Sequence, residues 1–276
     1  MIEKIRNFVL EAGQYAIDKK GRDKHNINFK WGEEAVSSMV TEVDLHISKM
    51  FRIFVEKNFS HLNYIIIDEE SLNQIEGDIF EQVKNTEYQF ILDPIDGTIN
   101  YAADIPLYGV LVSVFKHGKP LYGFMYAPDL DELVYTDGQQ VYYEHQKQTS
   151  IVPPNTPTIS RIIQGHPWAI NLKPNHFSGK YIMQDYFSAA IYLLYLVIGK
   201  VKGVFVRANI WDVAPALAIC KVLGMGFYDY YTGEEITEFS EKYFRPNCQA
   251  KTMRIACFKE DFETIKSLSE SVIELG

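Results

Sequence analysis

The 276-residue chain has few cysteines and no excess of positive charge. Its three cysteines, Cys220, Cys248 and Cys257, are odd in number and show no Cys-x-x-Cys spacing, a pattern typical of a reduced, cytoplasmic protein with structural thiols. The net charge of −9 argues against nucleic acid as the main partner, because phosphate backbones are bound through clustered Lys and Arg. It is compatible with a small phosphorylated substrate, since a divalent metal ion can supply positive charge locally.

The chain also lacks an apolar segment long enough to cross a bilayer. Its longest uncharged run, 186–199, lies between Asp185 and Lys200 and is too short for a membrane span, so it predicts a buried helix. The first residues, Met1-Ile2-Glu3-Lys4, do not resemble a signal peptide. We therefore expect a cytoplasmic protein with no membrane partner.

The composition that remains is that of a globular chain with a core, because 47% of the residues are hydrophobic and 23% are charged. Apolar periodicity and β-branched runs predict helices over 2–19 and 41–58 and strands at 64–67 and 88–92. Four further strands are predicted at 108–115, 121–126, 132–136 and 140–143. The turn pairs His117-Gly118 and Asp137-Gly138 favour tight hairpins, and hence an antiparallel sheet.

A proline-rich break at 153–157 is the predicted boundary between two domains, 1–150 and 151–276. Beyond it, strands are predicted at 161–164, 204–206, 227–230 and 253–258, and helices at 187–198, at 212–223 and after the last strand. The predicted fold class is thus an N-terminal α+β domain with an antiparallel sheet, followed by a C-terminal α/β domain.

Carboxylates stand at the ends of three apolar elements: Asp68-Glu69-Glu70 after one strand, Asp93 and Asp96 after the next, and Asp212 at the start of a helix. A carboxylate at a strand end projects into the crevice where ligands bind in layered α/β folds. Mg²⁺ prefers such oxygen ligands. Each feature alone is more simply a turn, a solvated loop or a helix cap; together they predict a magnesium site, because their type, order and approximate spacing match one known pattern.

The run Asp93-Pro94-Ile95-Asp96-Gly97-Thr98 carries most of this prediction. Its proline-stiffened turn is suited to present two carboxylates and the Ile95 carbonyl to one point. Gly97 and Thr98 are predicted to open a helix whose free N–H groups suit a phosphate. The Thr98 hydroxyl is placed to hold a water molecule.

These residues, in this order and approximate spacing, resemble the motifs of the inositol monophosphatase family. The resemblance is carried by 91–101 as the central motif, 68–71 as the upstream acidic motif, 211–214 as the downstream motif, 40–44 as a threonine-x-x-aspartate segment and 188–190 as the substrate loop. It covers almost the whole chain. It implies a layered αβαβα sandwich, a Mg²⁺-dependent and lithium-sensitive phosphatase, and a homodimer.

The resemblance also implies roles for single residues. Glu69, Asp93 and the Ile95 carbonyl would hold one Mg²⁺, while Asp93, Asp96 and Asp212 would hold a second; a third, looser ion would give two or three per site. Glu69 and Thr98 would position the nucleophilic water, with Asp93 bridging the metals as the third catalytic residue. The backbone N–H groups of Gly97 and Thr98 would bind the phosphate. Further substrate contacts would come from a set around the pocket: Phe187, Ser188, Ala189, Arg207 and Asp212.

The positions that would select the substrate depart from the family. Where its inositol phosphatases carry a glutamate about seven residues before the Trp-Asp motif, this chain has Phe205 or Val206, with Arg207 alongside. Phe187 stands where a glycine is expected, and would crowd the pocket or offer a stacking surface.

Three positions outside this pocket also need interpretation. Asp68 replaces a glycine and would add negative charge beside the metals. Asp44 is explained equally well as part of a helix-capping box with Thr41 and as a residue near the outer metal. Lys30 lies too far upstream to be matched with the family's lysine.

The sequence therefore predicts a Mg²⁺-dependent phosphomonoesterase that hydrolyses a small phosphorylated polyol, sugar or nucleotide with a metal-activated water, similar to an inositol-1-phosphate phosphatase. One alternative within the family is a phosphatase for NADP(H), 3′-phosphoadenosine 5′-phosphate or fructose 1,6-bisphosphate; Arg207 would favour it by meeting a second phosphate, unless Arg207 is simply a surface charge. Another alternative is a regulator that binds metal and phosphate without catalysis.

Overall fold

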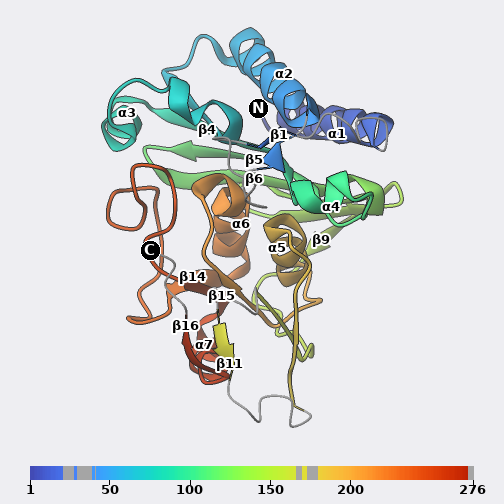
Figure 1. The fold of residues 1–276 in the computed structure, drawn as a ribbon, viewed down its shortest axis with the longest axis vertical. Coiled ribbons are helices and arrows are strands. Elements are labelled where there is room, and N and C mark those ends of the chain that lie inside the picture. Colours follow the sequence, from blue (N-terminus) through green and yellow to red (C-terminus); the bar gives the residue numbers. More distant parts are fainter. Residues whose placement is uncertain (21–27, 30–38, 41, 166–169, 173–179, 273–276) are drawn as a thin grey trace.

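The computed structural model describes residues 1–20, 28–29, 39–40, 42–165, 170–172 and 180–272. Its elements stack in alternating layers of helix and sheet (Figure 1). The outer helices α1 (Ile2–Lys19) and α2 (Glu42–Phe59) cover one face of a large sheet, and α5 (Ala189–Val197) and α6 (Ile210–Leu223) lie against its other face. A second sheet follows, with α7 (Phe262–Lys266) on its far side. This arrangement confirms the predicted layered αβαβα sandwich.

The large sheet has seven strands in the order β3-β4-β5-β6-β7-β8-β9. Their bounds are Tyr64–Asp68, Tyr88–Asp96, Gly109–Lys116, Lys119–Ala127, Glu132–Thr136, Val141–His145 and Gln148–Val152. Strands β3 and β4 are parallel, which differs from the predicted antiparallel sheet, whereas every later pair is antiparallel, as predicted. The β5–β6 turn places both His117 (φ 50°) and Gly118 (φ 73°) in the left-handed region, which a two-residue hairpin turn of this hand requires. Strand β9 was not predicted, because its first residues are polar and exposed and carry no apolar alternation.

Strand β4 is longer than predicted, because it continues past Leu92 to Asp96. Its pairing with β5 is interrupted between Asp93, opposite Leu111, and Asp96, opposite Gly109. Pro94 lies inside the interruption and has no N–H to donate to the ladder. The acidic run is therefore an irregular strand end and not a free turn; helix α4 (Thr98–Ala102) begins directly after it.

The second sheet has five strands in the order β12-β10-β13-β15-β14. In chain order the bounds are β10 Ile162–Gln164, β12 Ile182–Gln184, β13 Gly203–Val206, β14 Met225–Asp229 and β15 Arg254–Phe258. Strand β10 is parallel to both neighbours, whereas β15 is antiparallel to both of its own. The smaller elements are β1 Asn28–Phe29, β2 Met39–Val40, β11 Ile170–Leu172, β16 Ser269–Val272, α3 Ile79–Asn85, η3 Glu69–Gln74, η4 Pro128–Leu130 and η6 Lys259–Asp261.

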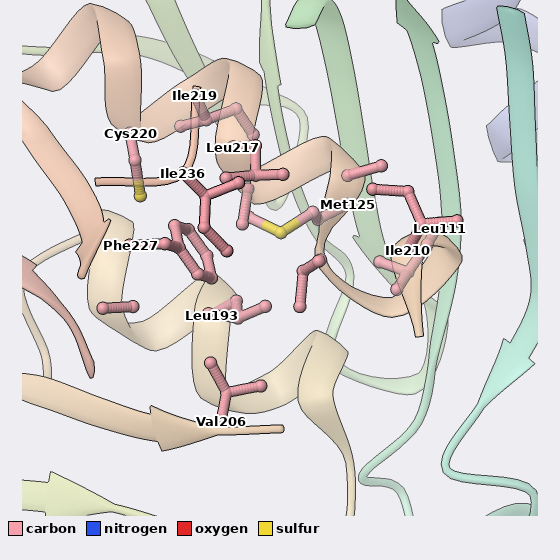
Figure 2. Close-up of a cluster of buried hydrophobic side chains, with 14 of the residues drawn as sticks. Leu111, Met125, Leu193, Val206, Ile210, Leu217, Ile219, Cys220, Phe227 and Ile236 are labelled. Atoms are coloured by element: carbon pink, nitrogen blue, oxygen red, sulfur yellow. The ribbon is translucent and has the colours of Figure 1, made fainter. Parts of the chain in front are cut away.

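Helix α6 lies at the centre of the molecule, where the two sheets enclose it. Figure 2 shows its residues Ile210 and Leu217 among Met125 of β6, Leu193 of α5 and Val206 of β13. The approach to β6 is backbone to backbone: a Cβ added to Gly123 would lie 2.2 Å from the Pro215 carbonyl oxygen. A helix so enclosed is apolar on all sides, and this packing fixes the position of its first turn.

The division of the chain near residue 150 stays a prediction. Helices α5 and α6 follow that boundary, yet they share one core cluster with the sheet that precedes it. Within the described part of the chain, no helix is both long and apolar enough to cross a membrane.

Candidate metal centre

Three carboxylates converge where β4 ends and α6 begins. Asp93, Asp96 and Asp212 each offer an oxygen, and these oxygens lie within 4.8 Å of one another. Asp93 and Asp96 come from the irregular end of β4, and Asp212 comes from the first turn of the buried helix α6. The structure thus brings together three of the residues that the sequence predicts as metal ligands.

Two of these carboxylates accept hydrogen bonds from nearby backbone N–H groups, and one of the two also accepts a hydrogen bond from a hydroxyl. Asp96 Oδ2 accepts hydrogen bonds from the Ser188 hydroxyl and from the Ala190 N–H at 2.7 Å, both at the start of α5. Asp212 Oδ2 accepts from the Asn209 N–H at 2.7 Å. Such bonds fix the orientation of a ligand before any ion is present.

Asp93 differs from the other two. It is 1% exposed, and its Oδ1 is buried without a hydrogen-bond partner among the residues that the structure describes. A buried carboxylate oxygen without a donor is costly, unless a cation approaches it. This oxygen is the observation that fits a divalent metal ion.

The electrostatics of the cluster agree with that fit. Burial raises the pKa of Asp93 well above its ordinary value, and the charges of Glu69, Asp212 and Asp96 raise it further. Burial, with Asp96 and Glu69, likewise raises the pKa of Asp212 well above that of a free aspartate. For Asp96, burial raises the pKa to about 6, although the Ser188 hydroxyl and two backbone N–H groups oppose it. Neighbouring carboxylates therefore disfavour one another's charge in the metal-free protein.

Glu69 supplies the fourth negative charge from the short helix η3, and Asp68 holds that helix in place. Asp68 is 1% exposed and accepts hydrogen bonds from the Ser48 hydroxyl of α2, from the Ser71 hydroxyl at 2.8 Å and from the Glu70 N–H at 3.2 Å. Its carboxylate is thus engaged by α2 and η3, a structural role that the sequence did not indicate; the added charge beside the metals stays a prediction.

Replacing Asp68 with alanine is expected to lower stability by about 1–3 kcal/mol, because it leaves buried hydroxyls without an acceptor. It is also expected to weaken Mg²⁺ binding, since the segment that carries Glu69 loses its anchor. Thermal unfolding and a Mg²⁺ titration measure the two effects. Asp78→Ala is the matched control, because Asp78 Oδ1 caps α3 through the N–H groups of Phe80 and Glu81. The control should lose stability without a change in Mg²⁺ affinity; equal Mg²⁺ affinities for the two variants would contradict the role of Asp68.

The turn after β4 is packed closely against the loop before α5. Gly97 has φ 86°, and a Cβ at this position would lie 3.0 Å from both the Leu107 carbonyl oxygen and the Ser188 Cβ. The Thr98 hydroxyl donates to the Ile95 carbonyl at 3.0 Å. The Asn100 amide donates to the carbonyl oxygens of Leu107 at 2.7 Å and Tyr186 at 2.6 Å. The Asn100 side chain therefore joins the two loops that flank the cluster. The sequence motif contains Asn100 but does not reveal this role.

The predicted substrate residues come from two places, the start of α5 and the residue that follows β13. Ser188 and Ala189 stand at the N-terminus of α5, beside Asp96. Phe187 is 50% exposed and adopts φ 53°. Arg207 is half-buried, with its Nε shielded from solvent, so it is not a fully exposed surface charge.

The two residues that could stand where a carboxylate was expected lie on opposite faces of the second sheet. Val206 is buried in the same core as α5 and α6 (Figure 2), whereas Phe205 belongs to the cluster on the opposite face of the sheet. Val206 therefore faces the layer that carries Asp212. Asp44 is buried in α2, and Thr41 and Lys30 lie outside the described residues.

The layered fold and the carboxylate cluster together define an α/β protein with a site suited to divalent metal ions. The sequence model of the inositol monophosphatase family matches residues 3–261. The chain belongs to this family.

Named proteins that are similar in sequence align with most of the chain. The fructose-1,6-bisphosphatase/inositol-1-monophosphatase of Thermotoga maritima is 25% identical over 270 residues, which cover 91% of this chain and 93% of the relative. The Nus factor SuhB of Pasteurella multocida is 25% identical over 212 residues, which cover 72% of this chain and 75% of the relative.

Solved structures of family members share the fold at low identity. A calcium-bound family protein of Staphylococcus aureus has a TM-score of 0.73 at 17% identity, covering 97% of this chain and 95% of that one. The inositol monophosphatase-II of the same organism, solved with 2′-AMP, has a TM-score of 0.69 at 18% identity, covering 95% and 91%.

Proposed function

We propose that the chain is a Mg²⁺-dependent phosphomonoesterase that hydrolyses a small phosphorylated polyol, sugar or nucleotide. The observation that carries the proposal is the cluster of Asp93, Asp96 and Asp212 around a buried carboxylate oxygen that has no donor among the described residues. Hard cations with oxygen ligands fit such a cluster. Membership of the inositol monophosphatase family supports the same reaction class.

The metal ligands would form two sets that share Asp93. Asp93, Asp96 and Asp212 would hold one Mg²⁺, and Asp93, Glu69 and the Ile95 carbonyl would hold another. When bound, the metal lowers the pKa of a water molecule and neutralises charge on the phosphate and its leaving oxygen. The hydrogen bonds from Ser188, Ala190 and Asn209 keep two of the carboxylates oriented for this task.

The turn that follows the ligands would bind the substrate. The N–H groups of Gly97 and Thr98 open α4 and would hold phosphate oxygens. The Thr98 hydroxyl already donates to the Ile95 carbonyl at 3.0 Å, so its lone pairs are left to accept from the attacking water, with Glu69 as the partner acceptor. Neither residue becomes covalently bonded to phosphorus in this scheme.

A panel of phosphate monoesters tests the proposal. Inositol 1-phosphate, fructose 1,6-bisphosphate, NADP and 2′-AMP are incubated with the protein in Mg²⁺ or in EDTA, and released phosphate is measured. At least one is expected to be hydrolysed in Mg²⁺ and none in EDTA. Hydrolysis at equal rates in both conditions would overturn the metal-dependent mechanism. Adding Li⁺ and measuring the mass in solution test the lithium sensitivity and the homodimer that the family resemblance implies.

A regulator without catalysis is a second candidate, which the similarity to the Nus factor SuhB of Pasteurella multocida favours. The two functions differ in a measurable way. A regulator would bind Mg²⁺ and phosphate esters, detected as a rise in the unfolding temperature, and would release no phosphate from any member of the panel.

A further inference from the structure

We propose that Phe187 is a specificity-determining residue whose ring stacks on the leaving group of the substrate, so that the site prefers a leaving group that carries a planar aromatic ring, such as a nucleoside, to a polyhydroxy ring. The inference rests on the proposed phosphatase function. It is carried by the backbone of Phe187, by its place beside the metal ligands and by the buried apolar residue that replaces the expected carboxylate.

The backbone of Phe187 is the first observation. Its φ of 53° lies in the left-handed region, which a bulky residue rarely adopts because of contacts with its Cβ. The conformation is imposed by two acceptors of the Phe187 N–H, namely Asp185 Oδ1 and Tyr192 Oη, each at 2.9 Å. A glycine would fit this position without strain. Strained backbone of this kind gathers at ligand-binding sites.

The place of Phe187 is the second observation. The next residue, Ser188, donates its hydroxyl to Asp96 of the metal cluster, and its Cβ lies 3.0 Å from a Cβ built at Gly97. Phe187 is therefore one residue from the group that contacts a metal ligand, yet half of its surface is exposed. An aromatic ring exposed at the edge of a charged site can cover an apolar ligand face.

The apolar residue at the end of β13 is the third observation, and it is independent of the first two. Val206 is 6% exposed and packs into the core beside α5 and α6. No carboxylate from 203–206 is available to accept hydrogen bonds from sugar hydroxyls. A polyol would lose those bonds on entering the site, whereas a planar base needs a ring to stack on, and aromatic stacking is tolerant of base identity.

The decisive comparison uses two phosphate esters with different leaving groups, 2′-AMP and glycerol 2-phosphate. In Phe187→Gly, the ratio of kcat/KM for 2′-AMP to that for glycerol 2-phosphate is expected to fall by about tenfold or more, because the stacking surface is lost. Phe187→Trp should keep the ratio. The glycine variant is expected to fold at least as stably as the wild type, since it removes the left-handed strain.

Gln146→Gly is the matched control, because Gln146 also has a positive φ, of 49°, and lies in the exposed β8–β9 turn. This control should leave the ratio unchanged. An unchanged ratio in Phe187→Gly, with phosphatase activity intact, would overturn the inference. If the wild type hydrolyses neither these esters nor any member of the panel above, the proposed function fails instead. Calorimetric binding of the two esters in Mg²⁺ then still decides the role of Phe187: weaker binding of 2′-AMP alone supports it, and equal binding of both esters by the variant and the wild type overturns it.

Discussion

Replacing Asp93 with asparagine is expected to abolish most of the phosphatase activity and, at the same time, to stabilise the metal-free protein. Even a residue that only orients a metal ligand is worth about 10–100-fold in activity or affinity, so loss of Asp93, which we propose as a ligand shared by two ions, should lower kcat by at least about 100-fold. The opposite effect on stability follows from the raised pKa of Asp93, which burial and the charges of Glu69, Asp212 and Asp96 produce. Removing one pKa unit of repulsion would add about 1.4 kcal/mol.

Urea unfolding in EDTA and phosphate release in Mg²⁺ measure the two effects on the same preparation. Asp229→Asn is a control for which the effect on stability is expected to have the opposite sign. Its carboxylate accepts from Arg254 Nη1 at 3.0 Å and from the Thr252 hydroxyl, and its pKa is lowered despite burial. This variant should lose stability and keep its dependence on Mg²⁺. An Asp93→Asn protein that retains full activity would show that the site is elsewhere.

The sequence predicts the convergence of Asp93, Asp96 and Asp212 because each carboxylate lies near one end of an apolar element and the three together match the motifs of the family. Such elements stack in only a few ways, and ligands gather where their ends meet. The irregular end of β4 was less predictable. Pro94 indicates that the hydrogen-bonded ladder is interrupted. That pairing resumes at Asp96 depends on the neighbouring strand β5, and no local sequence pattern shows this.

The polar contacts that support the site could not be predicted from the sequence. Asp68 accepts a hydrogen bond from Ser48 of α2, and Asn100 donates one to the backbone carbonyl of Tyr186, which lies in a distant part of the chain. A sequence pattern shows that these residues are polar but not which partners they meet. The choice between Phe205 and Val206 was left open by the sequence for a related reason, because a shift of one residue moves a side chain to the opposite face of a strand.

The contribution of the carboxylate cluster to the stability of the metal-free protein is expected to fall as pH rises from about 4 to 8, and Mg²⁺ is expected to reverse that trend. Folding raises the pKa of Asp93, Asp96 and Asp212. At these three positions the folded state therefore binds more protons than the unfolded state above about pH 4, the ordinary value for aspartate. The contribution of the cluster must then decrease as the pH increases through the folded pKa values, of which that of Asp96 is about 6.

Mg²⁺ changes the sign because it binds the deprotonated carboxylates of the folded state, so that its stabilising effect increases with pH. Other titrating groups contribute equally with and without the ion, and the difference between the two unfolding curves isolates the cluster. We expect this difference to be small near pH 5 and to widen by several kcal/mol towards pH 8, since each displaced pKa unit is worth about 1.4 kcal/mol. In Asp93→Asn the difference should shrink at every pH. A Mg²⁺ effect that is constant across this range would mean that the ion binds away from these three carboxylates, and the raised pKa values would then be a cost of the fold with no bearing on the reaction.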